Sequence, residues 1–448
     1  MRESRKMEAD IMLLEFKTKN YKSFANEMCF SMTPAPKQKG LDYSILSMRA
    51  GSKMYKGLST AVIYGPNASG KTNVIGAMDT FKAIVMRGNI RNADTVSLNY
   101  AAGALELIPN CNGDKLPTEF SIRFVNNGLM IEYSLKADLG TFMEKDYSRK
   151  IFEEKLLVNE KLIFLRNDTL CVELPTAIKD YVNSSIKRKT PKMLEIAESS
   201  LVDTELFLNN GFKSIYAQKL VTTILDWFSY KFIVIYHSED LRVVRKFADP
   251  KANTVYVEKT LTDAARAFGI TANALGYKPV TDKEGEDVEL YSIFGNKILP
   301  AEIFESYGTI RFINEFPLVI LALLNGGTLV MDEFDASIHP MALMNIVNIF
   351  HNDDVNKNNA QLVFNTHNPI FLDASLLRRD EIKFVERNDE TGNSEHYALS
   401  DFKTADGIRK GEDYMNNYFV SRYGAIKDID FSPILEKIIS GNEVIGNE

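Results

Sequence analysis

The sequence predicts an α/β protein with a mixed or parallel central sheet, an antiparallel β-subdomain and an inserted helical arm. Two apolar strands, residues 62–64 and 329–331, are each followed by a polar turn and then by apolar residues at helical spacing. Strands that alternate with helices favour a parallel sheet. Residues 118–138 instead alternate apolar and polar side chains around Asn126-Asn127-Gly128, which is a strong hairpin signal.

The chain has 448 residues, of which 45% are hydrophobic and 25% charged, as is usual for a soluble globular protein. This length is sufficient for about two to three domains. We place their boundaries at residues 1–175, 176–290 and 291–448. The net charge of −7 argues against a globally basic nucleic-acid-binding protein but leaves room for a local basic patch.

Nothing in the sequence predicts a membrane location. The longest apolar run, residues 317–324, is far shorter than the about 20 residues that span a bilayer. The first residues carry charge without a long apolar region, so we expect no signal peptide. The three cysteines are widely separated, at Cys29, Cys111 and Cys171. This spacing predicts neither a zinc site nor a disulfide framework, and a reducing cytoplasm is the expected location.

In chain order, the first half predicts mainly strands around one helix. The expected strands are 12–16, 24–32, the hairpin within 118–138, 150–158 and 161–165. Residues 41–57 contain lysine, serine and glycine and are expected to be rich in loops. A helix is expected from residue 71 to about residue 87, because apolar side chains recur there at helical spacing.

The middle of the chain has a helical pattern that predicts an inserted arm or lid. Apolar side chains recur at three- and four-residue spacing in 193–201, 204–208 and 216–230. The charged segment 281–287 is expected to be a loop that closes the insert. Two basic clusters could contact DNA or RNA, although a solvated helix face is the favoured explanation; they comprise Lys187, Arg188, Lys189 and Lys192, and Arg242, Arg245 and Lys246.

The α/β pattern returns near residue 306. We expect a helix from 306 to 324, which Pro317 can bend, and a second helix over 340–350. Short apolar strands are expected at 328–331 and 361–365. Their alternation with helices predicts that both belong to a parallel sheet.

A phosphate-binding loop follows the strand at 62–64. The pattern G-x-x-x-x-G-K-[ST] is matched by GPNASGKT, which comprises Gly65, Pro66, Asn67, Ala68, Ser69, Gly70, Lys71 and Thr72. Backbone N–H groups of such a loop surround the phosphates, and the following helix directs the positive end of its dipole toward them. Lys71 would reach the β- and γ-phosphates, and the Thr72 hydroxyl would ligate Mg²⁺.

Two further strands end in residues suited to nucleotide hydrolysis. Asp332 and Glu333 come directly after the strand at 329–331, and residues at the carboxyl end of a parallel strand face the ligand crevice. Asp332 is placed to hold Mg²⁺, and Glu333 to deprotonate the attacking water. His367 follows the strand at 361–365 and could sense the γ-phosphate, although a lone histidine is more often structural.

The order of these motifs resembles the ABC-type ATPase heads of the SMC, Rad50, RecF and OLD group of the AAA family. The resemblance implies that 65–72 is the Walker A loop and 329–333 the Walker B strand with its catalytic glutamate. It further implies a D-loop, a switch histidine and a reduced signature motif; these are Asp335, Ala336 and Ser337, then His367, then Ser306 and Gly308. In such proteins the signature binds ATP held by the opposite subunit, which implies at least a head-to-head dimer, with higher orders also compatible.

The chain departs from that pattern in two places. Its signature is SYGT, where the family has LSGGQ, and no convincing Q-loop glutamine lies between residues 87 and 117. A narrower resemblance, carried by LEFKTKNYKSF, GPNASGKTN and YFVSRYGAI, is to the RecF-like ATPases of bacterial anti-phage systems of the AbiL, PARIS and Septu types. It implies a separately encoded effector partner, often a nuclease.

Three functions are compatible with this pattern. The favoured one is an ATP-hydrolysing, Mg²⁺-dependent switch in an anti-phage complex. The alternative is a RecF- or Rad50-like DNA repair ATPase that clamps DNA, which would be expected to show a basic groove or long coiled-coil arms. A self-contained nuclease of the OLD kind is disfavoured, because only 81 residues follow His367 and they show no clustered D-x-D pattern.

Overall fold

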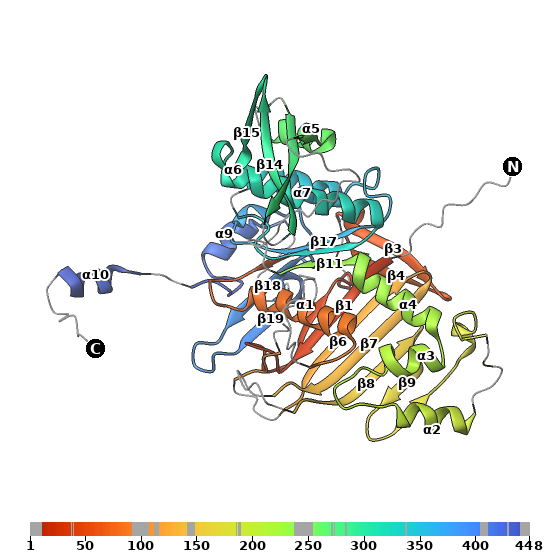
Figure 1. The fold of residues 1–448 in the computed structure, drawn as a ribbon. Helices are drawn as coiled ribbons and strands as arrows, with labels where there is room; N and C mark the ends of the chain where they lie inside the picture. The colour runs from red at the N-terminus through yellow and green to blue at the C-terminus, as the bar shows by residue number, and fades with distance from the viewer. Residues whose placement is uncertain are drawn as a thin grey trace, which may run out of the picture.

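The structure is a computed structural model. It describes residues 11–36, 38, 40–91, 107–111, 116–140, 148–184, 186, 190–236, 254–269, 272, 274–282, 285–336, 338–403, 411–427 and 430–439. The fold consists of a central mixed sheet, a larger antiparallel sheet and a smaller projecting β-hairpin layer (Figure 1).

The central sheet has six strands in the order β11-β16-β17-β5-β18-β19. The first five are mutually parallel, and β19 pairs antiparallel with β18. The strands are Phe232–Ile235 (β11), Thr328–Met331 (β16), Gln361–Asn365 (β17), Thr60–Tyr64 (β5), Ile382–Arg387 (β18) and Ser394–Ala398 (β19). The expected parallel sheet is therefore confirmed, and three of its strands lead directly into the motifs identified from the sequence.

Helix α1, Lys71–Arg87, packs with one face on the central sheet and with the opposite face on a seven-stranded antiparallel sheet. The strands of this second sheet, in spatial order, are Leu170–Val172 (β10), Lys161–Arg166 (β9), Lys150–Val158 (β8), Leu129–Asp138 (β7), Thr118–Asn126 (β6), Ile11–Lys19 (β1) and Met28–Ser31 (β2). The expected hairpin between β6 and β7 is present. Its turn residues Asn127 and Gly128 have φ values of 51° and 74°, the left-handed region that Asn and Gly tolerate best.

Aromatic rings join α1 to the antiparallel sheet. Phe81 of α1 stacks on Phe120 and Tyr133, with ring centroids 5.4 and 5.9 Å apart. The same core includes buried side chains of β5, such as Ile63. Helix α1 is thus fixed between the two sheets (Figure 1), and this fixes the start of the helix as well.

A buried glutamine ties the two sheets together. Gln361, at the start of β17, is fully buried. Its Nε2 donates to the carbonyls of Leu13 and Leu58 at 3.1 and 2.8 Å. Its Oε1 accepts from Leu13 N and from the Thr328 hydroxyl at 2.6 and 3.0 Å. One side chain therefore connects β17 with β1, β4 and β16.

The prediction of a loop-rich segment at 41–57 is wrong. Residues Ile45–Ala50 (β3) and Lys53–Leu58 (β4) form an antiparallel hairpin. Alternate residues of β3 are buried, namely Leu46, Met48 and Ala50. They pack against apolar side chains of β1, β6 and β7. The alternation of apolar and polar residues in β3 is the pattern of a half-buried strand, and the lysine, serine and glycine residues around it obscured this signal.

Helices are present in 176–290 near the expected segments 193–201 and 216–230, but the expected helix at 204–208 is wrong, because Glu205 there forms an isolated β-bridge with Asn89. The helices are Pro191–Ser199 (α2), Lys213–Ile215 (α3), Gln218–Asp226 (α4) and Lys259–Phe268 (α5), with π-helical turns at Leu208–Phe212 and Trp227–Lys231. The part around α4 packs closely on the antiparallel sheet, because Trp227 stacks on Phe124 with centroids 3.8 Å apart. The same segment also supplies strand β11 of the central sheet.

The expected charged loop at 281–287 belongs largely to a hairpin. Strands Ala274–Asp282 (β13) and Gly285–Phe294 (β14) pair along their whole length, flanked by Tyr256–Val257 (β12) and Lys297–Pro300 (β15). Residues 283 and 284 lie outside the described chain. The hairpin packs on α5 and α7 through a small core of its own and projects from the molecule with α6, Ala301–Phe304 (Figure 1).

Four helices complete the C-terminal half: Tyr307–Asn325 (α7), Pro340–Phe350 (α8), Tyr414–Phe419 (α9) and Ser432–Ile439 (α10). Helix α7 is the one helix in the described ranges that is long and apolar enough to span a membrane. It packs beside β16 and carries the buried ion pair Arg311–Glu315. Helix α10 projects away from the body (Figure 1).

Candidate functional site

The phosphate-binding loop connects β5 to α1 as expected. Both of its glycines are required by close packing. A Cβ atom on Gly65 would lie 2.2 Å from the carbonyl oxygen of Val385, and one on Gly70 would lie 2.6 Å from the hydroxyls of Ser23 and Ser394. Gly70 also has a φ of 106°, which L side chains rarely adopt. Asn67 and Ala68 at the tip of the loop are exposed, whereas Ser69 is buried.

Residues far away in the sequence support this loop. The Ser394 hydroxyl, from β19, donates to the carbonyl of Ser69 at 2.5 Å. Asn73 of α1 donates to the Ser23 hydroxyl at 2.8 Å, and Ser394 N donates to the carbonyl of Ser23 at 2.7 Å. Arg387 approaches the carbonyl of Ala68 at 3.4 Å. The loop is therefore buttressed by the β18–β19 hairpin and by the turn after β1.

Lys71 folds back onto its own loop. It is 6% exposed, and its Nζ donates to the carbonyls of Gly65 and Pro66 at 2.8 and 3.0 Å. Burial lowers the pKa of this ammonium to about 8, against the opposing effect of three carboxylates, those of Asp332, Glu333 and Asp335. The lysine and the acidic residues after β16 therefore belong to one site.

Asp332 and Glu333 lie at the carboxyl end of β16, and an asparagine from β17 holds both. The Asn365 amide donates to the carboxylate of Asp332, and its oxygen accepts the backbone N–H of Glu333. Asn365 and Asp332 are 1% and 6% exposed, whereas the Glu333 side chain is exposed. The structure thus buries the residue expected to hold Mg²⁺ and exposes the one expected to activate water.

His367 lies in the same site. Burial and the charge of Lys71 lower the pKa of the His367 imidazole, while Asp335 and Glu333 act in the opposite direction. The Thr366 hydroxyl donates to the carboxylate of Asp335 at 2.6 Å, which ties the residue expected in the D-loop to the turn that carries His367. Ala336 is half-buried, and Ser337 lies outside the described residues.

Ser306 and Gly308 lie elsewhere, at the start of α7. Ser306 is the N-cap of this helix, and its Oγ accepts from the N–H of Thr309 at 3.2 Å. Ser306 is exposed and Gly308 is buried. Within the described ranges, no hydrogen bond connects either residue to the phosphate-binding loop of the same chain.

Sequence reasoning missed three buried residues of this site: Asn365, Thr366 and Arg311. Arg311 of α7 donates to the carbonyl of Glu333 at 2.6 Å and to the Glu315 carboxylate at 2.8 Å. A polar residue at the end of an apolar strand, such as Asn365, is a usable sequence signal. Arg311 offered a weaker one, namely a charge pair at i and i+4 within an otherwise apolar helix.

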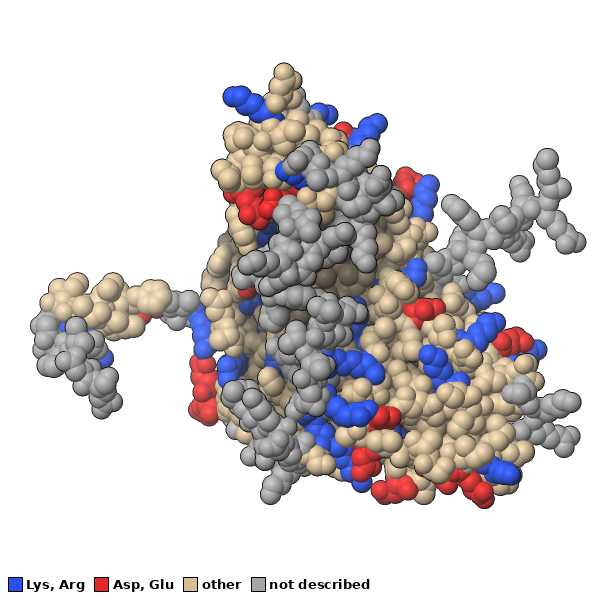
Figure 2. Space-filling view, in the orientation of Figure 1, with Lys and Arg blue, Asp and Glu red and all other residues tan. Residues whose placement is uncertain are grey.

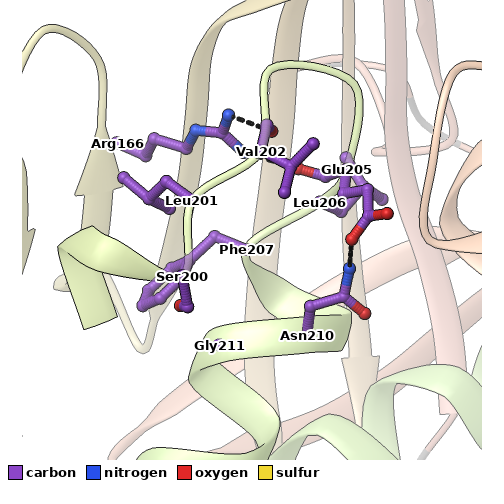
Figure 3. A pocket seen from close by; sticks show the side chains of 9 residues that line it. All are labelled: Arg166, Ser200, Leu201, Val202, Glu205, Leu206, Phe207, Asn210 and Gly211. Carbon is purple, nitrogen blue, oxygen red and sulfur yellow. Dashed lines mark hydrogen bonds between the residues drawn. The ribbon is translucent and has the colours of Figure 1, made fainter. Parts of the chain in front are cut away.

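Small depressions lie away from this site among the described residues. A shallow depression beside β9 is lined by Arg166, Glu205 and their neighbours (Figure 3). The Arg166 guanidinium already donates to the carbonyls of Glu205 and Val202 at 2.5 and 2.6 Å, so its role there is structural. Of the two expected basic clusters, only Lys192 is described, and it is exposed. Basic and acidic side chains are interspersed on the face shown in Figure 2.

A comparison with family models identifies the family to which this chain belongs. A family model described as "AAA domain, putative AbiEii toxin, Type IV TA system" matches residues 61–170 and 194–373. These ranges include the phosphate-binding loop, the acidic pair after β16 and His367. No curated protein matches the chain.

Solved structures similar to this chain include SMC head domains. One, from Thermotoga maritima, has 12% identity and a TM-score of 0.33, covering 86% of this chain and 98% of that chain. Another, an Smc head bound to the C-terminal domain of ScpA derived from Pyrococcus furiosus, has 11% identity and a TM-score of 0.38, covering 87% and 96%. These structural similarities are too weak to support the strand order described above. The family model, in contrast, spans more than half of the sequence, and the chain therefore belongs to this family of AAA domains.

Proposed function

We propose that the chain binds and hydrolyses ATP with Mg²⁺. The observation that carries this proposal is the convergence of three parallel strand ends. The loop after β5, the carboxylates after β16 and the histidine after β17 are close enough for Lys71 and His367 to respond electrostatically to the same acidic residues. Ligands bind at this edge of open α/β sheets.

The loop residues Gly65 to Thr72 would bind the phosphates through their backbone N–H groups and the N-terminus of α1. Lys71 would exchange its bonds to the loop carbonyls for bonds to the β- and γ-phosphates. Thr72 and Asp332 would hold Mg²⁺. The described residues contain no cluster of three His, Cys, Asp or Glu side chains that could bind a metal, and this donor set fits Mg²⁺, which takes few protein ligands and completes its shell with substrate phosphates.

Mg²⁺, when bound, neutralises charge on the phosphates. Glu333 would accept the proton of the attacking water, since its exposed side chain follows directly on the metal ligand. His367 would contact the γ-phosphate and register its loss. Asp335, which Thr366 holds beside this turn, would act with them at the γ-phosphate end of the site.

We further propose that the complete site forms between two copies of the chain. Ser306 is exposed at the N-terminus of a 19-residue helix, where a hydroxyl and free backbone N–H groups suit an anionic oxygen. Ser306 and Gly308 of one copy would close on ATP held by the other. Gly308 lacks a side chain that would obstruct a close approach to its backbone, although it is buried in the single chain and would have to become accessible.

The biological setting we propose is a cytoplasmic anti-phage complex in bacteria, in which this subunit senses infection and controls a separately encoded effector such as a nuclease. The name of the matching family, which refers to AbiEii and toxin–antitoxin systems, supports this setting. A RecF- or Rad50-like ATPase that clamps DNA is the second candidate. Salt-dependent binding of DNA by the ATP-bound form would favour it.

Two substitutions test the proposal. Glu333→Gln should bind ATP and accumulate as an ATP-bound dimer, because the nucleotide stays while the proton acceptor is lost. Lys71→Ala should lose ATP binding in a fluorescent-nucleotide titration. Asn358→Ala is the control; Asn358 lies in the segment before β17 and donates to carbonyls at the C-terminal end of α7, away from the carboxyl ends of the strands that form the site. Parental turnover in Glu333→Gln, or retained tight ATP binding in Lys71→Ala, would contradict the proposal.

A further inference from the structure

The peptide group on each side of Glu333 is held by a buried side chain from a different element. On the amino side, the N–H of Glu333 donates to Asn365 at the end of β17. On the carboxyl side, its carbonyl accepts from Arg311 of α7 at 2.6 Å and from Ala336 N at 3.0 Å. These bonds fix the backbone from which the Glu333 side chain projects.

The backbone conformation that they fix is an unfavourable one. Glu333 has a φ of 50°, in the left-handed region where a residue with a Cβ atom is strained. Such strain persists only where the surroundings determine it. The exposed carboxylate accepts no hydrogen bond from the described residues, so its direction depends on the backbone.

The two holding side chains are themselves fixed. Asn365 is 1% exposed, and its amide is oriented at both ends, by the Asp332 carboxylate and by the Glu333 N–H. Arg311 is 6% exposed, and its Nε donates to Glu315, which is 1% exposed. Neither side chain can relax without breaking a second buried polar contact, which makes the arrangement stiff.

We propose that Arg311 and Asn365 are positioning residues that hold Glu333 in its left-handed conformation and thereby direct its carboxylate toward the attacking water. This inference rests on the proposed ATP hydrolysis. Arg311 contacts the carbonyl of Glu333 and the carboxylate of Glu315, neither of which is a proposed ligand of the phosphates or of Mg²⁺. Loss of Arg311 should therefore reduce turnover while leaving ATP affinity nearly unchanged.

Arg311→Met is the test variant, since it keeps the apolar stem and removes the guanidinium that contacts Glu315 and Glu333. Arg379→Met is a matched control. Arg379 is also a buried arginine, 8% exposed, and donates to the carbonyls of Leu399 and Phe402 at 2.9 and 2.8 Å, remote from the site. We expect kcat to fall at least tenfold in Arg311→Met, with the Kd for ATP changed less than twofold. Turnover reduced no more than in Arg379→Met would overturn the inference.

Arg311→Lys separates positioning from stability. A lysine retains a charge beside Glu315, but one ammonium cannot reproduce the planar fork that contacts both Glu315 and Glu333. We expect the thermal stability of this variant to recover toward the parental value while turnover stays at least fivefold reduced. Full recovery of turnover would contradict the proposal that Arg311 must contact both Glu315 and Glu333 in order to position Glu333.

Hydrogen exchange distinguishes failure of this inference from failure of the proposed function. In the protein without nucleotide, the amides of 332–336 should exchange at least tenfold faster in Arg311→Met than in the parental protein and in Arg379→Met. This outcome supports the hold even if the parental protein shows no ATP turnover, a result that would contradict only the proposed hydrolysis. Unchanged exchange in these amides would overturn the hold itself.

Discussion

Raising the pH should weaken ATP binding through Lys71. Burial lowers the pKa of this ammonium to about 8, so the empty site loses a positive charge just above neutral pH. Bound phosphates would restore a high pKa, because an anionic oxygen favours the charged form. Binding must then take up a proton above pH 8, and the apparent Kd rises with the deprotonated fraction.

The expected size follows from this pKa. Between pH 7.5 and pH 9.0 the charged fraction of Lys71 falls by about eightfold, so the apparent Kd for ATP should rise by about the same factor. Phosphate groups lose their last proton near pH 6, so the ligand itself contributes little in this range. The measurement is a fluorescent-nucleotide titration at constant ionic strength, performed at half-unit steps of pH.

Lys82 supplies a matched control. It lies on the same helix, burial also lowers its pKa to about 8, and its Nζ donates to the carbonyl of Phe232 at 2.7 Å, away from the loop. Lys82→Met should retain the parental pH dependence of ATP affinity. A constant affinity across this pH range in the parental protein, or loss of the dependence in Lys82→Met, would refute the reasoning.

Three predictions concern stability. Gln361→Leu leaves buried backbone groups of Leu13 and Leu58 without partners. It should lower the free energy of unfolding, measured by urea titration, by about 3 kcal/mol. A loss below about 1 kcal/mol would show that Gln361 contributes little to the contact between the two sheets. Burial raises the pKa of the Glu315 carboxyl from 4.5 to about 7, so the folded state keeps a proton that the unfolded chain releases. As pH rises from 4.5 through 7, the free energy of unfolding of the parental protein should therefore fall by on the order of 2 kcal/mol relative to that of Glu315→Gln. If the free energies of unfolding of the two proteins changed equally with pH, the raised pKa of Glu315 would be contradicted. Because Glu333 is left-handed, Glu333→Gly should be about 1 kcal/mol more stable than Glu333→Ala in urea titrations, and equal stabilities would show that the site is unstrained.

The elements predicted correctly from the sequence are those with strong local signals. Strands β5, β16 and β17 are uninterrupted apolar runs, and each precedes a polar turn with recognisable chemistry. The hairpin at Asn127 and Gly128 requires left-handed residues, which its composition supplied. In these cases the pattern, the turn and the motif all favour the same structure.

What could not be predicted depends on contacts between distant segments. Asn365 contacts Asp332 only because β17 lies beside β16 in the sheet. The residues of these two strands do not by themselves predict that the strands are neighbours. Ser394 supports Ser69 across 325 residues. The strand β11 follows a helical pattern and contains only four residues, so its place at the edge of the parallel sheet is set by packing on its neighbours.

The site divides into a half that is already organised and a half that must rearrange. The acidic pair is fixed by Asn365 and Arg311 before any nucleotide arrives, whereas Lys71 is engaged with the carbonyls of Gly65 and Pro66 and must break these bonds to reach a phosphate. The affinity for ATP therefore depends on how well bonds from Lys71 to the phosphates replace its bonds to the loop carbonyls. The rate of hydrolysis depends on the position of Glu333, which is already set before ATP binds. Because different residues control the two halves, substitutions around Lys71 should change Kd and substitutions around Glu333 should change kcat. A variant of Arg311 that changed both in proportion would show that the acidic half is also assembled by the nucleotide.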